Sequence, residues 1–172
     1  MSSNKPRSIA LLAILLSIAA QSIAADADSY PRPEDVATID GIIDAYYDVV
    51  SGPEGHRYDA ERDQSLHAPD AIITRIMPDG SLQRHDLATE QIPLMEPYPE
   101  GFFEFEIKRI VEAYGDLAQV WSSFELRNSP DGEALSRGVN SISLYRFDAR
   151  WWVASWETQA EGDEPLPEKY LE

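Results

Sequence analysis

Three side chains in the sequence could accept a proton in a reaction: His67, Glu106 and Glu125. His67 stands where a helical segment gives way to a β-branched one, and an imidazole facing a pocket can exchange a proton near neutral pH. Glu106 and Glu125 lie inside strand-like segments, and a carboxylate that faces an apolar pocket has a raised pKa and can act as a general base. Packing for His67 and surface ion pairs for the glutamates are the simpler alternatives.

Aromatic side chains and one amide could hold a small molecule. Asn140 falls between Gly138 and Ile142 on an apolar strand face, so its amide needs a hydrogen-bond partner. That partner is either a ligand carbonyl or a neighbouring protein group, and the sequence leaves both open. The tyrosines are either core residues or phenolic donors. The expected pocket lining is Tyr46, Tyr47, Trp121, Asn140, Trp152 and Trp156.

Motifs that define common enzyme classes are absent from the sequence. It contains no H-E-x-x-H zinc motif, no G-x-S-x-G nucleophile motif, no glycine-rich phosphate-binding loop and no EF-hand loop. The histidines at 56, 67 and 85 share no spacing typical of metal ligands, and the chain has no cysteine. We therefore expect no metal site and no cofactor.

The N-terminal residues have the order of a secretory signal peptide. Lys5 and Arg7 precede an uncharged apolar stretch over 8–20, and small residues at Ser22 and Ala24 favour cleavage before Ala25. A membrane anchor is the alternative, but a spanning helix needs about 20 apolar residues. We expect a signal peptide over 1–24, a linker over 25–33, and an exported protein that is periplasmic or secreted.

The charge of the chain limits its partners. It carries 31 acidic and 14 basic side chains, for a formal net charge of −17. Such a surface repels phosphate backbones and anionic lipids, so we expect no nucleic-acid partner and no membrane partner after signal cleavage. The remaining length suits a single domain over 34–160, followed by an acidic C-terminal tail over 161–172.

Helical and strand patterns follow one another along the domain. Apolar residues three and four apart predict a helix over 33–50, and shorter helices are expected over 58–66 and 87–92 with Asp86 as an N-cap. β-branched and alternating segments predict strands over 71–77, 103–111, 117–127, 137–147 and 151–159. Helices followed by long strands indicate an α+β domain.

The last two predicted strands form a hairpin. If Phe147 pairs with Trp151, the inner face carries Asn140, Ile142, Leu144, Trp152, Ala154 and Trp156. The opposite face then carries Val139, Tyr145, Trp151 and Val153 and is unusually apolar for a solvated surface. We therefore expect a homodimer through that face.

Five short segments resemble one known superfamily. They are 66–71 (LHAPDA), 101–104 (GFFE), 120–125 (VWSSFE), 136–141 (SRGVNS) and 150–153 (RWWV). Together they are similar to the nuclear-transport-factor-2-like (NTF2-like) superfamily, in particular its SnoaL-like branch with uncharacterised bacterial members. The resemblance implies a cone, in which a curved antiparallel sheet wraps around about three helices and leaves a pocket at its open end.

The resemblance leaves the activity open, because this fold hosts isomerases, cyclases, dehydratases and proteins that only bind. We expect an exported protein that binds a small, largely apolar molecule in the cone pocket. One alternative is an enzyme of the isomerase, cyclase or dehydratase type that uses a buried carboxylate or His67 as its base. Another alternative is a dimeric interaction module without a ligand.

Overall fold

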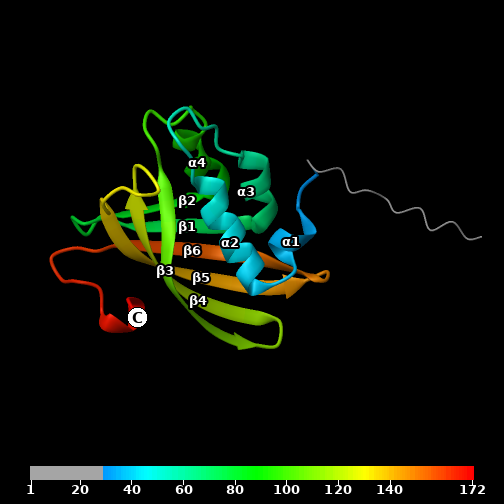
Figure 1. Cartoon of the computed structure of the whole chain (residues 1–172). Coiled ribbons are helices and arrows are strands. Elements are labelled where there is room, and N and C mark those ends of the chain that lie inside the picture. Colours follow the sequence, from blue (N-terminus) through cyan, green and yellow to red (C-terminus); the bar gives the residue numbers. More distant parts are fainter. Residues whose placement is uncertain (1–28) are drawn as a thin grey trace, which may run out of the picture.

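The computed structural model describes residues 29–172 (Figure 1). The predicted signal peptide over 1–24 and the first part of the predicted linker, residues 25–28, lie outside the described residues. Within 29–172, no helix combines the length and the apolar character needed to cross a bilayer.

Four short helices form one layer of the domain: α1 (Pro33–Val36), α2 (Ile39–Val50), α3 (Ala60–Leu66) and α4 (Leu87–Gln91). The predicted helix over 33–50 is interrupted because Thr38 is extended and caps a new helix, its Oγ1 accepting from Gly41 N–H at 2.9 Å. Asp86 caps α4 as predicted, since its Oδ1 accepts from Thr89 N–H at 2.8 Å. Short 3₁₀ turns follow at η1 (Ile92–Leu94) and η2 (Glu168–Tyr170).

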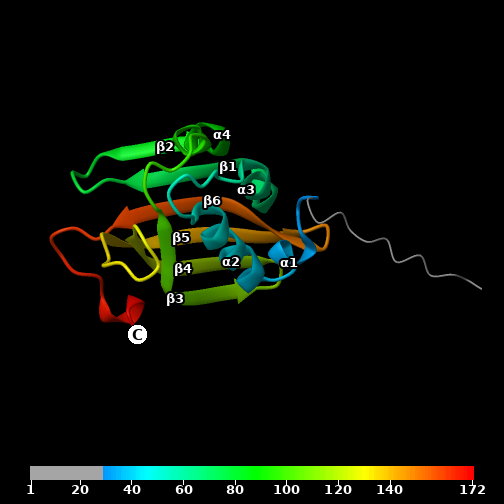
Figure 2. The ribbon, with the colours of Figure 1, turned by 45° about the horizontal axis from the view of Figure 1, so that its top comes forward.

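Six strands form a single curved sheet in the order β2-β1-β6-β5-β4-β3 (Figure 2). Their bounds are β1 His67–Ile76, β2 Leu82–Asp86, β3 Phe103–Tyr114, β4 Leu117–Arg127, β5 Ser136–Phe147 and β6 Arg150–Ala160. The sheet is not purely antiparallel as predicted, because β1 runs parallel to β6. β2 was not predicted from the sequence, because its residues are mostly polar. They are exposed at the edge of the sheet.

The β5–β6 hairpin departs from its predicted register near the turn. Asp148 and Ala149 both have positive φ, as a two-residue type I′ turn requires, so Phe147 pairs with Arg150 and not with Trp151. A bulge next to Ser143 then restores the predicted pairing of Ile142 with Trp156.

This register change corrects the predicted faces of β6. Val153 pairs with Leu144 and is fully buried, and Trp151 is also in the core. The predicted outer, dimer-forming face therefore loses both residues and keeps only Val139 and Tyr145 of the four named. The dimer itself stays a prediction.

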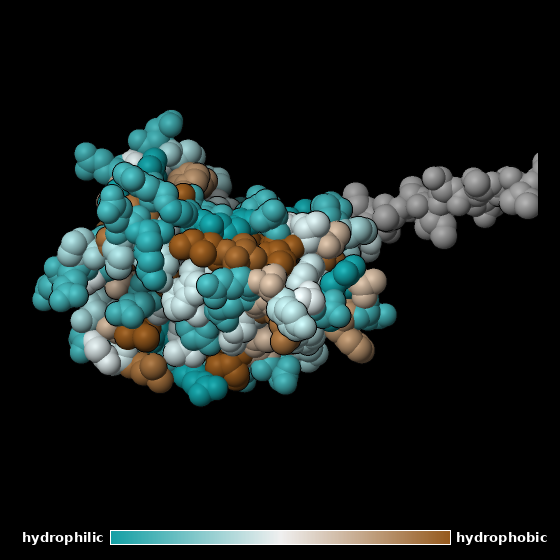
Figure 3. Space-filling view, turned by 90° about the horizontal axis from the view of Figure 1, so that it is seen from below, coloured by the Kyte–Doolittle hydropathy of each residue, from teal (hydrophilic) through white to brown (hydrophobic). Residues whose placement is uncertain are grey.

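The helices lie on the concave face of the sheet and enclose the core (Figure 1). Buried residues of α2 pack against buried residues of β4, β5 and β6, among them Ile42, Ile43, Val120, Ile142, Val153 and Trp156. Figure 3 shows the molecule from below, where hydrophilic side chains surround a short apolar band. The result is a mixed α+β fold with a cone shape, open at one end.

The acidic tail lies on the outer face of the sheet. The Tyr170 ring contacts the Trp121 ring with 6.1 Å between centroids, and the Tyr170 carbonyl accepts from Ser123 Oγ at 2.5 Å. Residues of the tail therefore cover part of the surface that the sequence assigned to a dimer contact.

Candidate functional site

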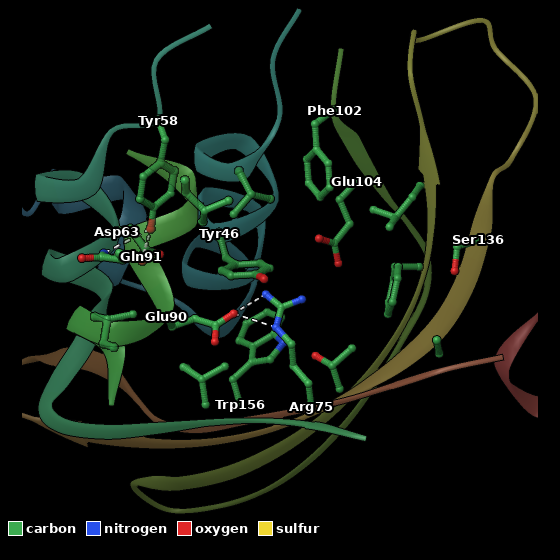
Figure 4. Close-up of a pocket in the computed structure, with 18 of the residues that line it drawn as sticks. Tyr46, Tyr58, Asp63, Arg75, Glu90, Gln91, Phe102, Glu104, Ser136 and Trp156 are labelled. Carbon is green, nitrogen blue, oxygen red and sulfur yellow. Dashed lines mark hydrogen bonds and ion pairs between the residues drawn. The ribbon is translucent and has the colours of Figure 1, made fainter. Parts of the chain in front are cut away.

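A cavity of about 220 Å³ lies between the helices and the concave face of the sheet (Figure 4). Residues of α2, α3, α4, β1, β3, β4 and β6 line it. Its apolar wall is formed by Val50, Ile73, Leu87, Leu94, Phe102, Phe124, Leu126 and Trp156. An apolar cavity with a few polar groups is typical of a small-molecule site.

Tyr46 and Trp156 form one aromatic wall of this cavity. Their ring centroids are 3.7 Å apart and the ring planes differ by 32°. Burial, with the nearby Glu104 carboxylate as the next cause, raises the pKa of Tyr46 well above its usual value. The Tyr46 hydroxyl therefore stays protonated and can donate a hydrogen bond. Both residues, which were expected in the pocket lining, line this cavity.

Glu104 on β3 supplies a carboxyl group to the cavity (Figure 4). Burial raises its pKa to about 7, while the Asn140 amide and the Arg75 charge act in the opposite direction. No ion pair to Glu104 forms among residues 29–172. The carboxyl group thus changes charge near neutral pH and is not committed to a cation.

Glu104 was not among the residues predicted from the sequence, where it alternates with Phe103 and Phe105 and an apolar ring is the usual choice for a buried face. In the structure these two rings stack on the outer face, 6.2 Å apart, and Arg127 lies over the Phe105 ring. The register between β3 and β4 shows which face Glu104 presents, because Glu104 pairs with Leu126 and both side chains line the cavity.

Arg75 of β1 also lines the cavity and is held by α4. Its Nε donates to Glu90 Oε1 at 2.6 Å, and its Nη2 contacts the same oxygen, so two guanidinium nitrogens form a two-point ion pair with one carboxylate oxygen. The other oxygen of Glu90 lies 3.3 Å from His85 Nδ1. Glu90 therefore occupies the guanidinium group that would otherwise be the nearest partner for an anion.

His67 lies at a polar corner of the cavity, where α3 meets β1. Its Nδ1 is 2.9 Å from the Asp63 carbonyl oxygen. A carbonyl only accepts, so Nδ1 carries the proton in the neutral ring and Nε2 presents a lone pair. Among the described residues, the buried Nε2 has no hydrogen-bond partner. His67, a candidate base in the sequence, thus lines the cavity.

The Asp63 side chain completes this corner. Its Oδ2 accepts hydrogen bonds from Tyr58 Oη and from Gln91 Nε2, the latter at 2.9 Å. Its Oδ1 has no hydrogen bond within the described part of the chain and lies 3.6 Å from His67 Nδ1. Sequence reasoning missed Asp63, Tyr58 and Gln91, which only tertiary packing brings together.

Asn140 and Tyr47 lie behind the cavity wall, so their predicted place in the lining is wrong. The fully buried amide of Asn140 donates to Tyr47 Oη at 3.3 Å and accepts from Thr158 Oγ1 at 2.7 Å. Tyr47 Oη in turn shares a 2.6 Å hydrogen bond with Ser122 Oγ. The partner of the Asn140 amide is therefore protein.

Two predicted tryptophans also lie outside the cavity. Trp121 is on the outer sheet face beneath the tail. Trp152 lines a separate surface groove, where the Arg150 guanidinium lies 3.6 Å from the centroid of one of its rings. The predicted register put Trp152 on the inner face, but the two-residue turn pairs it with Tyr145 on the outer face. For Trp121 no face had been assigned.

The two glutamates that the sequence singled out make ion pairs elsewhere. Glu106 accepts hydrogen bonds from Arg109 Nη2 at 2.6 Å and from Ser122 Oγ, the hydroxyl that also bonds to Tyr47. Glu125 contacts Arg127 and, at 3.5 Å, Arg137. Neither lines the cavity. Within residues 29–172, no group of three or more acidic, histidine or cysteine side chains could hold a metal ion.

Comparisons by sequence, with family models and with curated proteins, gave no match. Solved structures do match. A protein of unknown function with a cystatin-like fold from Nostoc punctiforme is 12% identical, with a TM-score of 0.56 over 75% of this chain and 92% of that one.

Two further matches carry the NTF2-like description. One is an NTF2-like protein of unknown function from Silicibacter pomeroyi, 13% identical, with a TM-score of 0.52 over 73% of this chain and 94% of the other. The second is a proposed dehydratase of the NTF2-like family from Streptomyces avermitilis, 16% identical, with a TM-score of 0.54 over 77% and 96%. The chain therefore has the NTF2-like fold, as the resemblance in its sequence predicted.

Proposed function

We propose that the cavity binds a small, largely apolar molecule that carries at least one polar group. The observation that carries this proposal is a set of three buried polar atoms, His67 Nε2, Asp63 Oδ1 and Trp156 Nε1, which have no hydrogen-bond partner within residues 29–172 and belong to residues that line the cavity. Leaving a buried polar atom unpaired costs about 1–3 kcal/mol. A ligand that supplies a donor and an acceptor removes this cost.

The size of the cavity supports a ligand with a single ring. An engineered cavity of about 150 Å³ in another protein binds benzene, and the volume here is about 220 Å³. The Tyr46 and Trp156 rings offer an aromatic surface for such a molecule. The tryptophan side chains do not fill the space, which favours binding over the alternative of an interaction module without a ligand.

The test is a panel of single-ring molecules that differ only in their polar group, measured by ligand-observed NMR on the chain from Ala25 to Glu172. The Ala160→Trp variant places an indole in the cavity wall, and Gly162→Ala is the control outside it. Binding by wild type and control that is lost in Ala160→Trp supports the proposal. Absence of binding across the panel, or binding unchanged by Ala160→Trp, contradicts it.

A second function, acid–base catalysis, is favoured by the combination of Glu104 and Tyr46. A carboxyl group with a pKa of about 7 can take up and return a proton at neutral pH. The Tyr46 hydroxyl, which makes no hydrogen bond within the described residues, could donate one to a substrate oxygen. The structural match from Streptomyces avermitilis, itself a proposed dehydratase, agrees with this class.

Deuterium exchange tests this second function. Cyclohexanone in deuterated buffer should exchange its protons next to the carbonyl faster with the wild-type chain, because Glu104 would remove the proton while Tyr46 stabilises the developing negative oxygen. Glu104→Gln should lower the enzyme-dependent rate by about 10²–10⁴-fold. Equal exchange rates for wild type and variant would contradict catalysis by Glu104 and leave ligand binding as the only proposed function of the cavity.

We also propose that the mature chain acts outside the cytoplasm, in the periplasm or as a secreted protein. The support is the order of charged, apolar and small residues over 1–24. N-terminal sequencing of the exported protein should give Ala25 as its first residue, and an intact Met1 would contradict export by this signal.

A further inference from the structure

We propose that the ligand is an amine, with its ammonium group at Glu104 and its apolar body against Tyr46 and Trp156. This inference rests on the proposed binding function and names the chemical class of the ligand. Three independent features of the cavity carry it: the balance of charges, the balance of hydrogen-bond donors and acceptors, and the aromatic wall.

The charges around the cavity favour a cation. Its lining includes three carboxyl side chains, Asp63, Glu90 and Glu104, and one arginine, Arg75. The two-point ion pair with Glu90 already occupies that arginine. An anionic ligand would have to displace Glu90 and lie close to Glu104, whereas a cation meets a carboxyl group that has no ionic partner among residues 29–172.

The unpaired polar atoms also favour a ligand rich in donors. Glu104 accepts one weak hydrogen bond, from Asn140 Nδ2 at 3.4 Å, and has further lone pairs. Three lining residues carry a buried polar atom without a partner in the described residues: His67 Nε2 and Asp63 Oδ1 are acceptors, and Trp156 Nε1 is a donor. An ammonium group has three donors and no acceptor, so it complements Glu104 and the two unpaired acceptors, which a carboxylate cannot do, and it leaves the Trp156 N–H unpaired.

The aromatic wall adds a third attraction. Tyr46 and Trp156 line the cavity together with Tyr58 and Phe102. A cation within about 6 Å of an aromatic centroid is attracted to the face of the ring. The chain's formal net charge of −17 attracts cations to the molecule as a whole.

Binding of an amine should depend on pH through Glu104. The charged and titratable groups that face it are Arg75 of β1, Glu90 of α4, Asp63 of α3, His67 at the start of β1, and Tyr46 and Tyr47 of α2. Burial raises the pKa of both tyrosines, and it raises the pKa of the nearby Tyr98 to about 12, so these phenols stay neutral. The pKa of about 7 makes Glu104 ionise between pH 6 and pH 8.

The experiment compares three probes of similar shape: 2-phenylethylamine, 2-phenylethanol and 3-phenylpropanoate. Their dissociation constants are measured by calorimetry or NMR titration at pH 6 and pH 8. We expect the amine to bind more tightly than the alcohol at pH 8 by about tenfold or more, and the acid to bind most weakly. The amine affinity should rise about tenfold from pH 6 to pH 8, the ratio of ionised Glu104 for a pKa of about 7.

The variants separate Glu104 from the other titrating groups. Glu104→Gln should remove both the preference for the amine and its pH dependence, whereas Glu112→Gln, an exposed glutamate on the same strand, should change neither. A pH dependence that persists in Glu104→Gln would assign it to another group, such as His67, and overturn the inference. If the alcohol binds as tightly as the amine or more tightly, the amine inference is overturned but the proposed binding function stands. If none of the three probes binds, both the inference and the proposed binding function are contradicted.

Discussion

Asn140 Nδ2 lies 3.4 Å from Glu104 Oε1, and this contact joins the carboxyl group of the cavity to a buried hydrogen-bond network. The same amide bonds to Tyr47 and Thr158, so one side chain on β5 connects a helix, two strands and the cavity wall. A donor fixed at this position favours the ionised form of Glu104. The network therefore holds the candidate ligand-binding carboxyl group in place.

Asn140→Leu should destabilise the free protein. The substitution leaves Thr158 Oγ1 and Glu104 without their hydrogen-bond partner and removes one of the two hydrogen bonds of Tyr47 Oη, which costs about 1–3 kcal/mol. Chemical denaturation of the ligand-free protein measures the change, with Ser141→Ala on the outer face as a control expected to stay within about 0.5 kcal/mol. An unfolding free energy equal to or above that of wild type would contradict the network.

Glu104→Gln should change stability in a way that depends on pH. The free energy of unfolding of the variant minus that of wild type should be larger at pH 8 than at pH 4.5. The pKa of Glu104 is about 7 in the folded chain and about 4.5 ordinarily, so the proton binds more tightly to the folded state. Stability from this group is therefore complete below pH 4.5 and is lost as pH rises to about 7. The loss is on the order of 2 kcal/mol, since each pKa unit corresponds to about 1.4 kcal/mol and part of the side chain is accessible.

Denaturation curves of wild type and Glu104→Gln at pH 4.5, 6 and 8 measure this difference. Because the two proteins share every other titrating group, subtracting one curve from the other isolates Glu104. Glu112→Gln serves as the control with the same change of charge on an exposed residue of β3. A difference that stays constant across the pH range would show that Glu104 titrates normally.

The sequence predicted most of the helices and strands in their order, all but β2 and the break between α1 and α2, because local signals determine them. The cap at Asp86 and the long alternating segments are such signals, and the structure confirms them. The orientation of β6 was wrong at Trp152 because a two-residue turn and a bulge shifted its register near the hairpin. Neither feature follows from the apolar pattern alone.

Prediction of the site was limited for a similar reason. Tyr46 and Trp156 were assigned to the cavity because they fall on faces that the helix and strand periods define, and His67 because it stands where a helix gives way to a strand. Glu104 was missed because the outer face of β3 is itself apolar, which reversed the apparent pattern. The pairing of Arg75 with Glu90 joins two elements whose contact no local pattern indicates.

Gly138→Ala should destabilise the fold and reshape the cavity. A Cβ atom at this position would lie 2.6 Å from the carbonyl oxygen of Gln159 and 2.6 Å from the Phe124 ring. Phe124 lines the cavity, so relief of the clash moves a cavity wall. We expect a loss of about 1–3 kcal/mol in thermal or chemical denaturation. Gly162→Ala, where a Cβ meets no atom within 4 Å, should be nearly neutral, and equal effects for both would contradict the packing.

A homodimer through the outer face remains a prediction, now restricted to the part that the tail leaves open. Tyr145 points to that face and is half-buried. Light scattering of the mature chain at micromolar concentration should give twice the monomer mass. Tyr145→Lys should reduce it to a monomer, and Arg146→Gln beside it should not. A monomer mass for the wild-type chain would contradict the dimer.

The most direct test of ligand binding in the cavity is the set of indole N–H signals in a ¹⁵N–¹H NMR spectrum of the mature chain. The four tryptophans report on different places: Trp156 on the cavity, Trp151 on the core, Trp152 on the surface groove and Trp121 on the outer face. On titration with 2-phenylethylamine and then 2-phenylethanol, the account predicts that the Trp156 signal shifts while the Trp121 signal does not move. A Trp156 signal that stays fixed at saturating concentrations of both probes would contradict it.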